Sequence, residues 1–195
     1  MIPDTFPERL ETPRFVVRAY RVGDEGLLNR SVNRSYEHLH PWMPWAKPDT
    51  SLEESAQVVR RFAAQWLLRQ EFILGIFAPD ESEQWGGTGF MLRGATPLEW
   101  RSTEIGMWIS AEKSGQGLGT AVLKALLRWG FTDWGWERME WFCDARNHAS
   151  ARTASRAGMQ REACLRGNCI DHLGYRRDTL IFGMLRSDWL GSPQD

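Results

Sequence analysis

The chain has 195 residues and carries 24 Lys or Arg against 25 Asp or Glu, a formal net charge of -1. This length suits one compact domain with a real core, and the 12% of aromatic residues argues against a disordered chain. The near-neutral charge argues against a nucleic-acid-binding protein, and no stretch approaches the roughly 18 apolar residues of a membrane helix. Since the N-terminus also lacks the apolar run of a signal peptide, we expect a cytoplasmic protein that binds neither nucleic acid nor membranes.

Cysteine and tryptophan are the two informative residue types in the composition. The three cysteines, Cys143, Cys164 and Cys169, form no CxxC pair and have no histidine at zinc-finger spacing, so we expect neither a disulfide framework nor a metal site. The 11 Trp suggest aromatic surface used for more than core filling.

The first half of the chain alternates strands and helices. Residues 1–13 hold three prolines and are expected to form an irregular leader before a single domain at 14–190, with a tail at 191–195. The elements expected next are a strand at 15–20, a helix at 24–35 capped by Asp24, a helix at 52–66, and a hairpin of strands at 72–77 and 88–92.

The helix at 52–66 begins with a capping box formed by Ser51 and Glu54. Its apolar side chains recur at helical spacing and predict one buried face: Leu52, Ala56, Val59, Phe62, Ala63 and Trp66. Between the two predicted helices, Pro41, Pro44 and Pro48 exclude a helix interior.

The second half gives a strand at 102–110, a helix from about 118, a strand at 139–143, a helix at 149–157 ended by Gly158, and a strand at 179–185. On the first of these strands Glu104 and Trp108 share one face. The helix from 118 has an apolar stripe that includes Trp129, and we expect Trp66, Trp129 and Trp141 in the core. This order of elements predicts an α/β (α+β) domain with a mixed sheet.

Three glycines, Gly115, Gly117 and Gly119, stand where the strand at 102–110 leads into the next helix. A glycine-rich turn leaves backbone N–H groups accessible at the positive end of the helix dipole, which favours an anion such as a diphosphate. The Walker pattern and the dinucleotide fingerprint both fail on this loop.

The segments Glu104–Ile109 and Ser114–Ala121, followed by Asn147-His148-Ala149-Ser150 and Gly158-Met159, resemble the acetyl-CoA signature of the GCN5-related N-acetyltransferase (GNAT) family. The stretch from Leu39 to Ala46, together with Tyr175-Arg176-Arg177-Asp178 and Asp188-Trp189, is similar to the RimJ and RimL branch, which acetylates ribosomal-protein N-termini. The resemblance implies a single domain with a mixed, mostly antiparallel sheet of about seven strands, a central parallel splay and about four flanking helices.

In this family acetyl-CoA lies between two splayed parallel strands, which here correspond to the strands at 104–110 and 139–143. The resemblance implies that strand backbone, the glycine loop and the Asn-x-x-Ser helix hold this cosubstrate, with no metal. The implied contacts are Met107, Trp108, Ile109, Ser114, Gly115, Gln116, Gly117, Leu118, Gly119, Thr120, Asn147 and Ser150. Ser114 replaces the usual Gln or Arg of the family's loop, so we expect weaker cofactor affinity, with backbone amides and Lys113 compensating.

The resemblance places Glu104 as a base acting through water. The alternative is that Glu104 only binds a neighbouring arginine. Tyr175 and Ser150 are the candidates for protonating the CoA thiolate. Alternatively, Ser150 is the N-cap of its helix and Tyr175 an edge-strand aromatic. Cys143, with no histidine to activate it, is expected to be a packing residue.

The expected reaction is direct attack of a primary amine on acetyl-CoA. The leading acceptor is the α-amine of a protein or peptide, such as a ribosomal protein, with Trp42 and Trp45 as walls of its cleft. A small amine such as an antibiotic or polyamine is the alternative, suggested by Glu37, and a CoA-binding sensor without turnover is the third possibility. The expected assembly is a monomer or homodimer.

Overall fold

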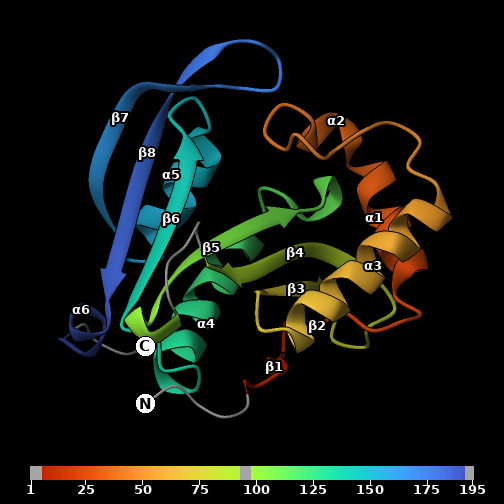
Figure 1. Ribbon diagram of the computed structural model, residues 1–195, viewed down its shortest axis with the longest axis horizontal. Helices are drawn as coiled ribbons and strands as arrows, with labels where there is room; N and C mark the ends of the chain where they lie inside the picture. Colours follow the sequence, from red (N-terminus) through yellow and green to blue (C-terminus); the bar gives the residue numbers. More distant parts are fainter. Residues whose placement is uncertain (1–5, 93–97, 192–195) are drawn as a thin grey trace. The chain divides into compact units, whose positions relative to one another are not determined.

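The computed structural model describes residues 6–92 and 98–191, shown as a ribbon in Figure 1. Within these residues eight strands form one sheet in the order β1-β2-β3-β4-β5-β6-β8-β7, and β5 pairs with β6 in parallel. The strands are β1 (Arg9–Glu11), β2 (Val16–Ala19), β3 (Glu71–Phe77), β4 (Gln84–Met91), β5 (Ser102–Ile109), β6 (Arg138–Asp144), β7 (Gln160–Ile170) and β8 (Arg176–Leu185).

Six α-helices accompany these strands in the described part of the chain. They are α1 (Glu25–Arg34), α2 (Tyr36–Leu39), α3 (Leu52–Leu67), α4 (Leu118–Thr132), α5 (His148–Arg156) and α6 (Arg186–Gly191). The mixed, mostly antiparallel sheet confirms the expected fold class, with one more strand and two more helices than the approximate numbers expected.

The chain divides into two compact units. The N-terminal unit holds Glu8–Met91 and Gly106–Leu118. The C-terminal unit holds, among the described residues, 6–7, 92, 98–105 and 119–191. Strand β5 therefore contributes its first half to the C-terminal unit and its second half to the N-terminal unit.

Each predicted helix and strand is present within a few residues of its expected bounds, except that β4 begins at Gln84 instead of 88. Four elements were missed: β1, which lies inside the expected leader, β7, α2 and α6. Strand β7 has no apolar alternation and two irregularities in its register, so its antiparallel pairing with β8, and not its own pattern, defines it.

Helices α1 and α3 of the N-terminal unit pack against strands β2 and β3 (Figure 1). The buried cluster between them contains Val16, Tyr20, Leu28, Val32, Val59 and Phe77. The predicted capping box of α3 is confirmed, because the Glu54 N–H donates to Ser51 Oγ at 3.2 Å and the Ser51 N–H donates to Glu54 at 2.8 Å. The predicted apolar face is wrong at Leu52, which is 57% exposed, and Trp66 is only half-buried, edge-on to Phe72.

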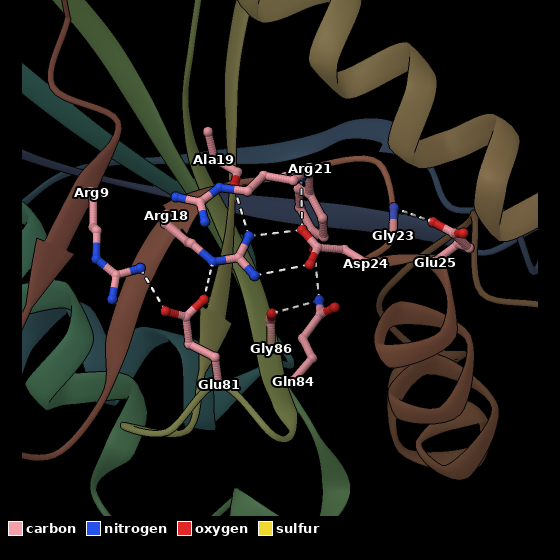
Figure 2. A network of polar contacts seen from close by, with 11 residues as sticks. Arg9, Arg18, Ala19, Arg21, Gly23, Asp24, Glu25, Glu81, Gln84 and Gly86 are labelled. Carbon is pink, nitrogen blue, oxygen red and sulfur yellow. Dashed lines mark hydrogen bonds and ion pairs between the residues drawn. The ribbon is translucent and has the colours of Figure 1, made fainter.

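A buried ion network joins β2 to the start of α1, as Figure 2 shows. The guanidinium of Arg18 donates to both carboxylate oxygens of Asp24, at 2.7 and 2.9 Å, pairs with Glu81, and lies 4.0 Å from the ring centre of Phe77. Asp24 precedes the first residue of α1 but makes no side-chain cap bond, so the predicted capping role is wrong. Leaving the buried guanidinium of Arg18 without a counter-charge would cost more free energy than leaving the helix without a side-chain cap, so Asp24 pairs with Arg18.

Strand β5 approaches β4 closely at two glycines of the N-terminal unit. A Cβ on Gly86 would overlap the carbonyl oxygen of Trp108, and a Cβ on Gly87 would overlap its indole. Thr88 Oγ1 donates to the carbonyl of Gly106 at 2.7 Å, and the Ser110 N–H donates to the carbonyl of Trp85 at 2.8 Å. Strand β4 begins earlier than predicted because Gly86 and Gly87 are strand residues in close contact with β5 and not turn residues.

The C-terminal unit is built on α4 and the strands β6, β8 and β7. In the part of α4 that belongs to this unit, four leucine and valine side chains are buried: Val122, Leu123, Leu126 and Leu127. Trp129 and Trp141 are each 5% exposed, which confirms their predicted core positions. Trp134, 1% exposed, stacks on Phe6 at a centroid distance of 4.8 Å, so the end of α4 lies against the N-terminal segment.

Replacing Gly86 by Ala should lower the free energy of unfolding by about 1–3 kcal/mol, because the added methyl group must displace the backbone of β5. Urea unfolding of the purified variant measures this change.

Gly26→Ala is the matched control, since a Cβ there meets only the flexible end of Arg30, at 3.4 Å. Its stability should not fall, and equal losses in the two variants would contradict the close-contact explanation.

Candidate functional site

The glycine loop, Ser114–Gly117, connects a short 3-10 turn to helix α4 and is exposed along its length. Gly115 and Gly117 have φ angles of +75° and +76°, which side chains rarely adopt. No heavy atom lies within 4 Å of a Cβ built on either residue. The loop is therefore an open turn whose backbone conformation depends on glycine.

The side chains of Gln116 and Lys113, beside these glycines, make contacts outside the loop. The side-chain amide of Gln116 donates to the carbonyl of Glu112 at 2.7 Å, and the ammonium of Lys113 lies 4.4 Å from the ring centre of Trp85. Ser114 is exposed. The features left to attract an anion are accessible backbone N–H groups at the start of a 15-residue helix, and these fit a diphosphate.

The second half of β5 directs its backbone groups alternately to its two edges. The hydrogen bonds of Gly106 and Ser110 go to β4, and the Trp108 carbonyl lies against Gly86. The N–H and C=O groups of Met107 and Ile109 therefore face the opposite edge. Of the three predicted backbone contacts on this strand, Met107 and Ile109 have their backbone groups at the free edge, whereas the backbone of Trp108 faces β4.

The predicted acceptor residues lie in the N-terminal unit, and α2 carries the exposed Glu37. Trp42 and Trp45 follow α2 in a non-helical segment and are 38% and 48% exposed. The indole of Trp45 contacts that of Trp108 edge to face, with ring centres 5.8 Å apart. The structure thus connects the proline-rich segment to β5, a contact that no sequence pattern indicated.

Glu104 lies in the C-terminal unit, in the part of β5 that pairs with β6, and is half-buried. Its register partner is Glu140, whose carboxylate accepts from Arg138 at 2.8 Å. Arg138 also donates to Glu162 and holds the pKa of that carboxyl below its usual value. The neighbouring carboxylate Glu140 is therefore neutralised by its own arginine.

Asn147 and Ser150 lie at the start of α5, next to β6. Asn147 is the N-cap, because its side-chain oxygen accepts from the Ser150 N–H at 3.0 Å, so the alternative of Ser150 as N-cap is wrong. The hydroxyl of Ser150 accepts from the indole N–H of Trp141 at 2.9 Å. Burial raises the pKa of the nearby Cys143 thiol, which fits a packing residue.

Tyr175 is 63% exposed and lies between β7 and β8. Its N–H donates to Asp171 at 2.8 Å, and Asp171 pairs with Arg146, which also pairs with Asp144. The C-terminal unit thus contains Glu104, Asn147, Ser150 and Tyr175, whereas the N-terminal unit contains the loop and the tryptophans.

Among residues 6–92 and 98–191, no three His, Cys, Asp or Glu side chains are grouped to hold a metal ion. In the same ranges, no helix combines the length and the apolar character that crossing a membrane requires.

The family model for the acetyltransferase (GNAT) domain matches residues 14–160, so the chain belongs to the GNAT acetyltransferase family. A curated relative is an uncharacterised N-acetyltransferase, YoaA, of Bacillus subtilis strain 168. It is 27% identical over 184 residues, which are 91% of this chain and 96% of the relative.

Solved structures share the fold. RimL, a ribosomal L7/L12 α-N-protein acetyltransferase in complex with coenzyme A, gives a TM-score of 0.81 at 21% identity, covering 93% of this chain and 99% of RimL. The ribosomal-protein-S5-alanine acetyltransferase of Vibrio fischeri gives 0.78 at 18% identity, covering 96% and 100%. The microcin C7 self-immunity acetyltransferase MccE, in complex with acetyl-CoA and AMP, gives 0.78 at 19% identity, covering 89% and 93%.

The protein is therefore an acetyl-CoA-dependent N-acetyltransferase of the GNAT type. The open glycine loop, at the start of α4, fits the negatively charged diphosphate of this cosubstrate.

Replacing Gly117 by Val should weaken acetyl-CoA binding at least tenfold. The φ angle of +76° strains any branched side chain, and the side chain fills the open space beside the loop. Isothermal titration calorimetry measures the dissociation constant.

Gly23→Val is the control, because Gly23 also has a positive φ, +109°, with nothing within 4 Å of its Cβ position, but lies before α1. If both variants bind acetyl-CoA like the parent protein, the loop is not the diphosphate site.

Proposed function

We propose that this enzyme acetylates the α-amine of a peptide or protein N-terminus. The observation that carries the proposal is the exposed pair Trp42 and Trp45 in a proline-rich segment, with Trp45 packed against Trp108 of β5. Exposed, rigidly held indoles suit the apolar and amide surfaces of an extended chain. Two of the structures with this fold are named as ribosomal-protein acetyltransferases, which supports the same class of acceptor.

Acetyl-CoA supplies the acetyl group as a thioester. In the balanced reaction the acceptor ammonium first loses one proton, the neutral nitrogen then forms a bond to the acetyl carbon, and the C–S bond breaks. The nitrogen loses a second proton as the amide forms, and the leaving CoA thiolate gains one. An α-amine, with a pKa near 8, releases this proton far more readily than a lysine, with a pKa near 10.4. The demand on a protein base is therefore modest.

In this proposal Glu104 accepts the proton through water, since it is a half-buried carboxylate on β5, the strand whose second half carries the free backbone groups of Met107 and Ile109. The backbone groups of Met107 and Ile109 bind the pantetheine amides as a neighbouring strand does. The hydroxyls of Tyr175 and Ser150 remain the candidates for donating a proton to the leaving thiolate, and Ser150 is oriented by Trp141.

The second candidate acceptor is a small-molecule amine. The exposed Glu37 on α2, eight residues before Trp45 in the sequence, is the specific observation that favours it, because a carboxylate attracts an ammonium group.

The two acceptor classes are tested with a panel of amines. The panel contains short peptides with free Ala, Ser or Met N-termini, the same peptides with blocked N-termini, spermidine and an aminoglycoside. Release of free CoA thiol measures turnover. We expect turnover with at least one free peptide and none with its blocked form, whereas turnover with the small amines alone would contradict the proposal. In the same assay Trp45→Ala should raise KM for the peptide with little change in that for acetyl-CoA.

Glu104→Gln should lower kcat about 100-fold at pH 7 while leaving acetyl-CoA affinity unchanged. The loss should shrink as the pH rises above about 8, because the amine is then neutral without a base. The pH profile of kcat measures this effect, with the exposed Glu99→Gln as the control. A Glu104→Gln enzyme with the parent's profile removes Glu104 from the mechanism.

A further inference from the structure

Strand β6 of the C-terminal unit runs beyond its last pair with β5. Within the described residues the parallel pairing ends at Glu140, whereas β6 continues to Asp144 with its register partners on β8. Trp141 and Cys143 lie in this continuation, and because they are two positions apart they share one face of the strand. Ser150, in the first turn of α5, lies against that face, since its hydroxyl meets the indole of Trp141.

The hydroxyl of Ser150 has a fixed donor. The indole N–H of Trp141 donates to Ser150 Oγ at 2.9 Å, and Trp141 is 5% exposed, so this bond is largely shielded from water. The backbone N–H of Ser150 donates to the N-cap Asn147 at 3.0 Å. An indole N–H donates but cannot accept a hydrogen bond. The hydroxyl proton of Ser150 is therefore directed away from Trp141 and toward another acceptor.

The sulfur of Cys143 is a weak partner for that proton. Burial raises the pKa of this thiol, and its side-chain hydrogen bond with Ser150 opposes the rise. A neutral thiol is a weak acceptor, whereas bonds to an ionised acceptor are roughly twice as strong as bonds between neutral groups. A second sulfur that carries a negative charge therefore competes successfully with Cys143 for the Ser150 proton.

Such a thiolate arises during acetyl transfer. When the C–S bond of acetyl-CoA breaks, the electron pair of the bond stays on the CoA sulfur, and the charge persists until the sulfur takes up the proton that the nitrogen releases. A donor that is in place before the bond breaks stabilises this charge without reorganisation. Ser150 meets this requirement, because Trp141 holds its hydroxyl and Asn147 holds its backbone.

We propose that Trp141 is a positioning residue for acetyl transfer, whose indole N–H orients the Ser150 hydroxyl to donate a hydrogen bond to the CoA thiolate. Trp141 acts through Ser150 and does not itself contact the sulfur. This role rests on the proposed function in one respect, the choice of Ser150 over Tyr175 as the group at the sulfur. It does not depend on which amine is acetylated.

Comparison of CoA with desulfo-CoA, in which hydrogen replaces the thiol group, tests this role. Calorimetric titration of the enzyme gives both dissociation constants, and their ratio isolates the contribution of the sulfur. A thiol ionises near pH 8.5, so titrations between about pH 6.5 and 9.5 cover both of its charge states. The parent enzyme should prefer CoA over desulfo-CoA increasingly as the pH rises through this range.

Trp141→Phe keeps an aromatic ring in the core and removes the indole N–H. At about pH 9.5 it should lower the preference for CoA about 3- to 10-fold, with the affinity for desulfo-CoA unchanged. Trp129→Phe is the matched control, because Trp129 lies in α4 of the same unit and is also 5% exposed. Its preference should equal that of the parent enzyme. An equal loss of affinity for both ligands in Trp141→Phe would show a structural role alone and contradict the proposal.

Ser150→Ala is a small change at a half-buried position and keeps the test decisive if Trp141→Phe fails to fold, which thermal unfolding checks. It should lower the preference for CoA at least as much as Trp141→Phe. The double variant should lose no more than Ser150→Ala alone, because Trp141 acts through the Ser150 hydroxyl. Additive losses would overturn the proposal, and so would a loss of the preference in Tyr175→Phe while Ser150→Ala retains it.

Both ligands bind without an acceptor amine, so the two proposals fail separately. If the ratios change as expected but no peptide reacts, the proposed acceptor is wrong and the role of Trp141 stands. If peptides react but the ratios do not change, only the positioning role fails. With any amine that reacts, Trp141→Phe should lower kcat about 3- to 10-fold with an unchanged KM for acetyl-CoA.

Discussion

The close approach of β5 to the glycines of β4 is the constraint on which the N-terminal unit depends. Because Gly86 and Gly87 have no Cβ, the backbone and indole of Trp108 lie directly against β4. This contact orients β5 so that Met107 and Ile109 keep their backbone groups at the other edge, and it holds the indole that Trp45 contacts. Cosubstrate binding and acceptor binding are thus both linked, in our proposal, to one pair of glycines.

The anion site in this protein depends on local groups and not on the overall charge, which explains how a chain with a net charge of -1 can bind anions. Arg18 is buried with Asp24 and Glu81, and Arg138 is held by Glu140 and Glu162. These arginines are fully used inside the fold. The backbone amides at the start of α4 remain available for an anion.

The glycine loop was predictable because its chemistry is local: glycines at positive φ before a helix are visible in the sequence. The capping box of α3 was predictable for the same reason. Asp24 was misjudged because a distant buried charge, Arg18, competes for its carboxylate. Strand β7 was missed because its pairing with β8, and not its residue pattern, makes it a strand. The orientation of the β5 backbone also depends on hydrogen bonds to β4, which no spacing reveals.

The sequence by itself determined the family, the position of the loop and most elements, since these follow from residue periodicity, glycine and capping chemistry over a few neighbouring residues. Only the tertiary structure decided which atoms are free to act. It placed Trp45 against Trp108 and made Asn147 and not Ser150 the cap of α5. The reason is physical: hydrogen-bond satisfaction is a property of side chains brought together from distant parts of the chain.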